Sequence, residues 1–265
     1  MPTAKKRTRT YDPAKIRTAV HAQFGHVRQA VAALTPEQLA LPTRLGEWTV
    51  RDLAAHLTMT VAAVSRALER EEPATADLAL LDYASATAPF AEAIATGTRQ
   101  LAAAQPDLDA LFARTEQELA ERLDAAGASR VLDIRAGGIT LTDFLVTRAL
   151  ELVVHTDDLN AAVPGLDVPL DRQALAACTR LLADTLAAKA PGGATEVRIP
   201  PYAVVQCVEG PRHTRGTPPN VVETDPLTWI RLATGRLEWK DAVADAKVSA
   251  SGERADLSGL LPLLT

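Results

Sequence analysis

The sequence predicts a multi-domain protein: an all-α bundle of four helices followed by a small α+β domain. The first half carries apolar side chains at helical spacing and is rich in alanine, the strongest helix former. After residue 190, runs of alternating polar and apolar residues indicate strands instead. Composition shifts at residues 163–165 and again at Pro169. We therefore expect a basic disordered tail over 1–11, a bundle over 12–165 and an α+β domain over 171–265.

Capping signals mark where the first two helices begin. Asp12 followed by Pro13 opens the first helix, because proline fits the first helical position and an acidic residue caps it. Thr49 and Asp52 form a capping-box pattern that opens the second. Apolar residues at helical spacing should face the core from both helices: Ile16, Val20, Phe24, Val27, Val31 and Leu34 from the first, and Leu53, Leu57, Val61, Val64 and Leu68 from the second.

The other two bundle helices are less sharply bounded. An alanine-rich region over 82–126 is expected to be helical with a break near Gln105-Pro106. A further capping pattern at Thr140 and Asp143 opens the last helix, which should run to about Ala162. Four amphipathic helices of this length favour a bundle.

The second domain is predicted to mix helices and a mostly antiparallel sheet. A helix over 171–189 precedes the strands, a short helix begins at Asp225-Pro226, and a helix over 256–264 ends the domain. The expected strands are 195–199, 202–208, 221–224 and 247–252, with a loop or irregular hairpin over 209–220.

Composition excludes several functional classes. The 28 Lys and Arg residues against 33 Asp and Glu give a net charge of −5, which disfavours nucleic acid as a partner. No apolar stretch approaches the roughly 18–20 residues of a transmembrane span. Cys178 and Cys207 cannot form a disulfide framework and are expected as buried thiols. We expect a cytoplasmic protein, and the oligomeric state stays open.

The sharpest chemical signal is a pair of residues four apart on the last bundle helix. Glu151 and His155 lie on one helix face, where a carboxylate and an imidazole suit a divalent metal, zinc above all. His56 is the best third ligand, because a histidine in the middle of an apolar helix needs a polar partner. The alternative interpretation is a solvated helix face or a simple ion pair.

Other polar residues near these motifs have two possible roles. Asp52, Asp157 and Asp158 either orient the ligating imidazoles or serve as helix caps and surface residues, and the second role is expected for each. Trp48 is expected to anchor the start of its helix rather than to contact a ligand.

Two segments of the first domain resemble a known family. Residues 46–57 (GEWTVRDLAAHL) and 148–159 (RALELVVHTDDL) are similar to the second- and fourth-helix signatures of the mycothiol-dependent maleylpyruvate isomerase N-terminal domain, a DinB-like bundle. The resemblance covers about residues 12–163 and implies a metal held by His56, Glu151 and His155. It further implies that mycothiol, a small thiol, binds at the metal.

This resemblance suggests a reaction. Two histidines and one glutamate leave open positions on zinc, as in catalytic sites. A cation beside sulfur favours the thiolate, which is the nucleophile. The expected activity is a mycothiol-dependent isomerase or S-transferase acting on a small electrophile, with no catalytic residue of the protein assigned.

The second domain resembles a bacterial sterol-carrier-like domain. The segments that carry the resemblance are 197–202, 209–224, 232–239 and 248–253. It implies a fold able to enclose an apolar cavity, so a carrier of a lipid or hydrophobic small molecule is the alternative function. Arg212, His213 and Arg215 in one loop are candidate contacts for an anionic group of the cofactor, or else residues of a solvated loop.

One feature of the isomerase is not matched. Its activity also draws on an arginine of its C-terminal domain, for which Arg231 and Arg236 are the candidates in this chain. Maleylpyruvate as substrate is therefore not carried over. Three hypotheses follow: a metal- and thiol-dependent enzyme, a hydrophobic-ligand carrier, or a metal-stabilised scaffold without catalysis.

Overall fold

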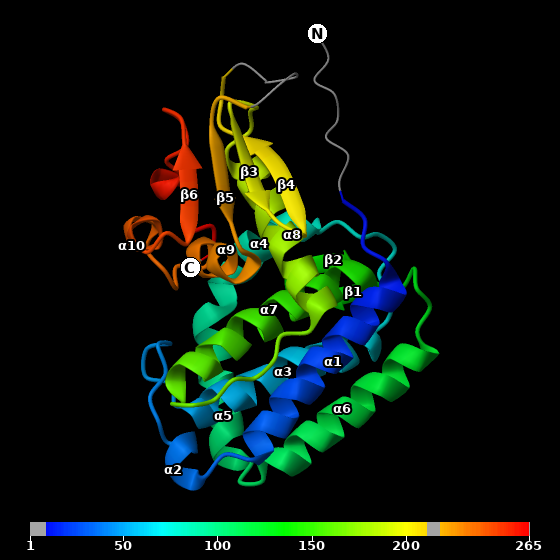
Figure 1. The fold of residues 1–265 in the computed structure, drawn as a ribbon. Helices are drawn as coiled ribbons and strands as arrows, with labels where there is room; N and C mark the ends of the chain where they lie inside the picture. The colour runs from blue at the N-terminus through cyan, green and yellow to red at the C-terminus, as the bar shows by residue number, and fades with distance from the viewer. Residues whose placement is uncertain (1–8, 211–217, 265) are drawn as a thin grey trace.

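A computed structural model of the chain describes residues 9–210 and 218–264. Its larger part is a bundle of long helices, and a small sheet with its own helices lies against one side of it (Figure 1). The long bundle helices are α1 (Pro13–Ala32), α3 (Val50–Leu68), α5 (Ala91–Ala104), α6 (Leu108–Ala125) and α7 (Leu141–Ala162). Shorter elements between them are α2 (Pro36–Leu39), η1 (Leu80–Asp82), α4 (Tyr83–Thr87) and η2 (Ala88–Phe90). The predicted fold class is confirmed.

The caps predicted from the sequence begin the helices. The Asp12 carboxylate accepts hydrogen bonds from the first turn of α1. Thr49 and Asp52 form the reciprocal capping box of α3, and the Thr140 hydroxyl accepts from the backbone N–H of Asp143 in α7. These contacts fix where α3 and α7 start, and so which of their residues face each other.

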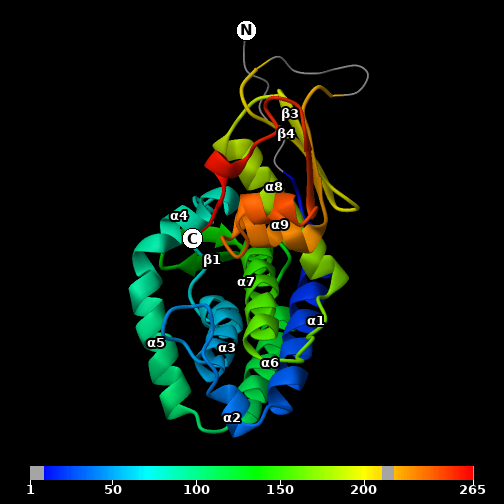
Figure 2. The same ribbon diagram turned by 60° about the vertical axis from the view of Figure 1, so that its left-hand side comes forward.

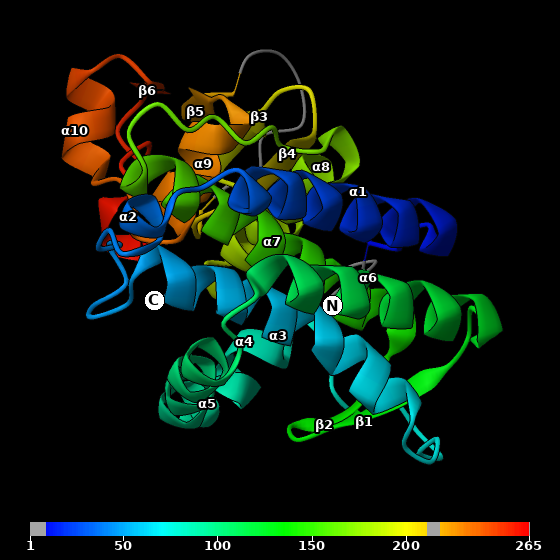
Figure 3. The same ribbon diagram turned by 90° about the horizontal axis from the view of Figure 1, so that it is seen from below.

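The segment between α3 and α7 is more divided than predicted. The helical region breaks at Gln105, as expected, but it forms two long helices, α5 and α6, and α5 packs beyond α3 at the edge of the bundle (Figure 3). A hairpin of β1 (Val131–Ile134) and β2 (Gly137–Thr140) was not predicted. Its strands are too short for alternation to be read, and Gly137, the first residue of β2 after the turn, has a positive φ of 132° that favours glycine.

The second part follows the predicted order of helix and strands. It contains α8 (Arg172–Lys189), β3 (Thr195–Ile199), β4 (Ala203–Cys207), β5 (Val221–Thr224), α9 (Pro226–Ala233), α10 (Trp239–Ala244) and β6 (Val248–Ser251). The sheet order is β4-β3-β5-β6. Its β3–β4 and β5–β6 pairs are antiparallel and its β3–β5 pair is parallel, so the sheet is mostly antiparallel, as predicted.

Two expectations for this part need correction or addition. The predicted helix over 256–264 is wrong, because only the short turn η3 (Ser258–Leu260) forms there. Pro262 has no backbone N–H to donate and disfavours helical geometry at the residue before it. Helix α10 was not predicted, and most of the expected 209–220 loop lies outside the described residues.

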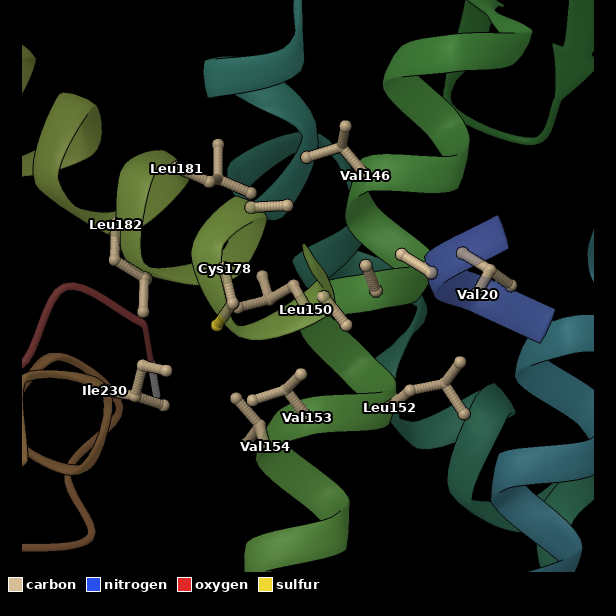
Figure 4. Close-up of a cluster of buried hydrophobic side chains, with 14 of the residues drawn as sticks. Val20, Val146, Leu150, Leu152, Val153, Val154, Cys178, Leu181, Leu182 and Ile230 are labelled. Atoms are coloured by element: carbon tan, nitrogen blue, oxygen red, sulfur yellow. The ribbon is translucent and has the colours of Figure 1, made fainter. Parts of the chain in front are cut away.

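Helix α7 lies in the middle of the molecule. It packs against α1 and α3 on the bundle side and against α8 on the other, while α9 packs on α8 (Figure 2). One apolar core runs across these helices, as Figure 4 shows for Val20 of α1, Val146, Leu150, Leu152, Val153 and Val154 of α7, Cys178, Leu181 and Leu182 of α8 and Ile230 of α9. The domain boundary near residue 165 stays a prediction.

No helix in the described part of the chain is both long and apolar enough to cross a bilayer. Cys178 and Cys207 are free and buried, as expected.

Candidate metal centre

The three candidate metal ligands come together between α3 and α7. His56 lies in the middle of α3, and Glu151 and His155 lie one turn apart on the face of α7 that packs against it. One ligand atom from each residue lies within 4.8 Å of the other two. Among the residues the structure describes, no other group of His, Cys, Asp and Glu side chains is arranged in this way.

The spacing of the donor atoms fits a metal ion. The Nε2 atom of His56 lies 3.3 Å from Oε2 of Glu151, and Nε2 of His155 lies 3.4 Å from the same oxygen. Donors around a tetrahedral zinc ion with bonds of about 2.0 Å are about 3.3 Å apart. Direct charged hydrogen bonds are usually shorter, at about 2.7–2.9 Å. Two imidazoles and one carboxylate at these distances therefore suit a divalent ion such as zinc.

The nitrogen of each imidazole that faces away from Glu151 also has a polar partner. Nδ1 of His155 lies 2.8 Å from Oδ2 of Asp158, and Nδ1 of His56 lies 3.4 Å from the Thr98 hydroxyl of α5. Histidines that bind metals usually donate their second N–H to such an oxygen, which fixes the tautomer and the ring orientation. Nε2 of His56 also lies 3.4 Å from the hydroxyl of Thr60. Both rings thus present Nε2 to the shared carboxylate.

Asp158 has a different role from the one expected. Its carboxylate is fully buried and binds Arg236 through two short hydrogen bonds, of 2.8 and 2.7 Å, besides its contact with His155. Burial opposes its ionisation, but the hydrogen bonds with His155 and Arg236 lower its pKa to about 2. The expectation of a cap or surface role is therefore wrong for Asp158, because α7 turns this residue inward.

The two other aspartates behave differently. The cap or surface role expected for Asp157 is also wrong, because this residue is buried and binds Arg231 at 2.6 Å; it does not touch His56 or His155. Asp52 is the helix cap that was expected, since its carboxylate accepts from the backbone N–H of Thr49. Of the three aspartates, Asp158 alone contacts an imidazole of the cluster.

The ligand side chains differ in charge. Burial lowers the pKa of His56, so this imidazole is neutral at pH 7. Desolvation by the surrounding protein acts to raise the pKa of Glu151, but hydrogen bonds with His155 and His56 hold this pKa well below its usual range. Burial also opposes the charge on His155, yet Asp158 and Glu151 raise its pKa to about 9. Without a metal, the cluster pairs a carboxylate with one neutral and one charged imidazole.

Glu151 is the most exposed residue of the cluster. Its side chain is 30% exposed, against 14% for His155 and 8% for His56. Trp48 is tilted against His56 with the two ring centroids 5.0 Å apart. Trp48, expected to anchor the start of α3, therefore also packs against His56 of the cluster.

Arg148 is a residue near the site that the sequence reasoning missed. It lies one turn before Glu151 on α7, and its buried guanidinium donates to the Tyr83 hydroxyl and lies 4.6 Å from the centroid of the Phe144 ring. The sequence pattern that could have identified it is a charged residue within an otherwise apolar helical run, three residues before the candidate ligand Glu151. The structure brings a fixed positive charge close to the cluster.

Not every predicted site residue is brought to this centre. Arg212, His213 and Arg215 lie outside the described residues. Arg231 and Arg236, the candidates for the isomerase's C-terminal arginine, bind Asp157 and Asp158 on α7.

Comparison with known families accounts for both halves of the chain. Residues 20–160 match the family model described as "Mycothiol maleylpyruvate isomerase N-terminal domain". The chain belongs to this family. Its second part, residues 171–263, matches the model "Bacterial SCP ortholog". Both resemblances read from the sequence are thereby confirmed. No curated protein matches the chain.

Solved structures share the fold over nearly the whole length. A crystal structure of the mycothiol-dependent maleylpyruvate isomerase, and one of a histidine-to-alanine mutant of that enzyme, superpose with TM-scores of 0.59 and 0.61. Each is 16% identical in sequence, and each match covers 93% of this chain and 95% of the other. At this identity the likeness establishes the arrangement of bundle and α+β part.

Proposed function

We propose that this family member is a metal- and mycothiol-dependent enzyme, an isomerase or S-transferase acting on a small electrophile. The observation that carries the proposal is the convergence of His56, Glu151 and His155, with the outer nitrogen of each histidine held by a polar partner. Membership of a family named for mycothiol supports the choice of thiol.

The chain's own residues support chemistry on an external thiol. His56 and His155 hold Nε2 toward the carboxylate of Glu151, and Glu151 is the most exposed residue of the three, which leaves the cluster in contact with solvent on that side. Burial raises the pKa of the Cys178 thiol, so this cysteine is not a nucleophile. A divalent metal bound by the three side chains supplies the positive charge that favours thiolate over thiol. Zinc is the metal we propose.

The substrate class is a small electrophile, and the identity of the substrate is left unassigned. Arg231 and Arg236 are each engaged by a buried carboxylate of α7, so maleylpyruvate is not carried over from the related structures. A cytoplasmic location stays our expectation, in keeping with two free, buried cysteines.

The alternative, a carrier of hydrophobic ligands, has less support. A hollow of about 320 Å³ in the second part is bordered by Leu232, Trp239 and Leu261, but also by the charged side chains of Glu238, Lys240 and Asp256. This mixed lining is unlike the mostly apolar lining of a lipid cavity.

Metal analysis of His56→Ala tests the metal assignment. Wild-type protein loaded with zinc should hold one ion per chain. His56→Ala should lose stoichiometric zinc and melt at a lower temperature than the loaded wild type, because Glu151 and His155 lose their partner from α3. His21→Ala on α1, outside the cluster, is the control and should keep its zinc. Unchanged zinc content in His56→Ala would refute the assignment.

Cobalt substitution tests whether a thiol reaches the metal. Cobalt in place of zinc gives a visible spectrum that responds to its ligands, and saturating mycothiol should shift that spectrum. A methyl thioether of the same compound is the control, because it cannot form a thiolate. A spectrum that stays the same with saturating mycothiol contradicts thiol activation.

A further inference from the structure

Helix α7 buries a positive charge that no carboxylate of the described residues neutralises. Among the residues the structure describes, Arg148 is the only lysine or arginine that is buried. No aspartate or glutamate in those ranges lies at ion-pairing distance from it. Its donors meet neutral oxygens instead: the hydroxyls of Thr147 and Tyr83 and the carbonyl of Thr60. Charges taken out of water are ordinarily paired, so a buried cation with neutral partners marks a place where an anion is stabilised.

Two aromatic rings enclose this guanidinium without cancelling its charge. The central carbon of the Arg148 guanidinium lies 4.6 Å from the centroid of the Phe144 ring and 5.4 Å from that of the Tyr83 ring. The ring faces attract a cation through their quadrupoles, but they carry no net charge. The attraction between a cation and an anion is stronger in such an enclosed place than in water. The charge of Arg148 is therefore available to a ligand.

Arg148 lies beside the metal centre. It precedes Glu151 by three residues, so the two side chains share one face of α7. Thr60 of α3 connects the guanidinium to the cluster: its carbonyl oxygen lies 3.5 Å from Nη1 of Arg148, and its hydroxyl lies 3.4 Å from Nε2 of His56. The cation and the imidazole thus both contact one residue, which places them within the length of a small organic acid.

The charges around the loaded centre favour an anionic ligand. Glu151 offsets only part of the charge of a divalent ion, and imidazoles that bind a metal are neutral. The nearby carboxylate of Asp158 is already paired with Arg236. The charge of Arg148 therefore adds to a positive surplus at the centre.

We propose that Arg148 is a specificity-determining residue, which binds a carboxylate of the electrophile that meets the thiol at the metal centre. The inference rests on the proposed function and narrows its substrate class from a small electrophile to one that carries a carboxylate. A guanidinium fork binds both oxygens of a carboxylate, in bonds about twice as strong as those with neutral oxygens. The carboxylate can therefore displace the hydroxyl of Tyr83, which comes from α4, a helix without a buried residue.

Small thiols that carry an acid or an amide test the inference, because each acid joins a sulfur for the metal to a carboxylate for Arg148. The full chain is loaded with cobalt and titrated with mercaptoacetate, 3-mercaptopropionate and 4-mercaptobutyrate, and with the uncharged amide of each. The visible spectrum reports binding of the sulfur, and each amide has the shape of its acid without the charge. At the chain length that binds best, wild type should bind the acid about tenfold more tightly than the amide, the effect of one charge-assisted hydrogen bond.

Three variants assign this preference to its residue. Arg148→Met has a side chain of similar length without the charge, so its preference for the acid should fall to about twofold or less. Arg148→Lys keeps the charge but not the fork, so its preference should lie between those of Arg148→Met and wild type. Arg17→Met on α1 is the control, because this half-buried arginine donates to the backbone carbonyls of Leu123 and Ala126. It should keep the preference of wild type.

Tyr83→Phe separates recognition of an acid from a structural role of Arg148. This variant removes the hydroxyl but leaves the cation, so it should melt at a lower temperature and still prefer the acid at least as strongly as wild type. If the preference is lost in Tyr83→Phe as it is in Arg148→Met, the inference is overturned, because packing of α4 would then explain both losses.

The remaining outcomes distinguish this inference from the proposed function. Thiols that bind wild type equally well as acid and amide overturn the inference alone, and so does a preference that persists in Arg148→Met. If Arg148→Met does not hold cobalt, an undiminished preference in Arg148→Lys overturns it. A cobalt spectrum that no thiol changes overturns the proposed function together with the inference.

Discussion

An imidazole has two nitrogens, and at the candidate centre both nitrogens of each histidine have a polar partner. Nε2 of His56 and of His155 faces Glu151, while Nδ1 of each ring faces an oxygen of Thr98 or Asp158. The partners come from different elements, α5 for His56 and α7 itself for His155. The orientation of each ring is therefore set by residues outside the cluster of His56, Glu151 and His155.

Thr98→Val should weaken zinc binding. Valine has nearly the shape of threonine but no hydroxyl, so Nδ1 of His56 would lose its partner in a fully buried place. We expect zinc affinity to fall by about tenfold in a chelator competition. Thr115→Val on α6 is the control, since this buried hydroxyl bonds only the carbonyl of Leu111. Equal affinities in the two variants would contradict the role given to Thr98.

The sequence allowed the cluster of His56, Glu151 and His155 to be predicted but not its surroundings. Glu151 and His155 followed from helical spacing, and His56 from its place in an apolar run. Thr98 has no such signal, because nothing in a sequence states that α5 packs beside α3. Asp158 was considered as a partner of a histidine but was expected to be a cap or surface residue. The face of α7 that carries it is covered by Arg236 from the loop after α9, which the sequence does not reveal.

At the scale of elements, the helix caps determine where the residues of the cluster lie. The capping box of Thr49 and Asp52 fixes where α3 begins. This start determines the place of His56 along the helix and the direction in which it points. The same caps were predicted from the sequence, because a cap depends on residues three apart. The hairpin β1–β2 and helix α10 were not, since they are short and are stabilised by packing.

Thr49→Ala should destabilise the protein moderately. The hydroxyl of Thr49 accepts from the backbone N–H of Asp52, and loss of such a cap costs about 1 kcal/mol. Urea denaturation should report this decrease in the free energy of unfolding. Thr18→Ala, at an exposed place within α1, should leave stability equal or slightly higher, because alanine is the better helix former. A loss of the same size in both variants would argue against the capping role.

At the scale of the whole molecule, the apolar core does not stop where the composition changes. Helix α8 packs on α7 and α1 of the bundle and on α9 and β4 of the second part. The change in composition at residues 163–165 can be recognised in the sequence, but the packing across it cannot. Apolar spacing indicates that one face of a helix is buried, but it does not indicate which element covers that face. The fold class was therefore predictable and the arrangement of the two parts was not.

Leu182→Ala tests whether the two parts unfold together. Leu182 of α8 is fully buried in the core drawn in Figure 4, and its truncation should cost about 2–5 kcal/mol. Calorimetry should show one transition in wild type and one, at lower temperature, in the variant. Val243→Ala on α10 is the control: this side chain is exposed, so the change should stay within about 0.5 kcal/mol. Two separate transitions would contradict a shared core.

The place of α8 also bears on any attempt to work with half of this protein. A fragment ending near residue 165 would leave the stripe of Val146, Leu150 and Val153 on α7 facing water where α8 now covers it. An uncovered apolar stripe of that kind promotes aggregation. Excising the bundle for separate study would require those positions to be redesigned, or α8 to be kept attached.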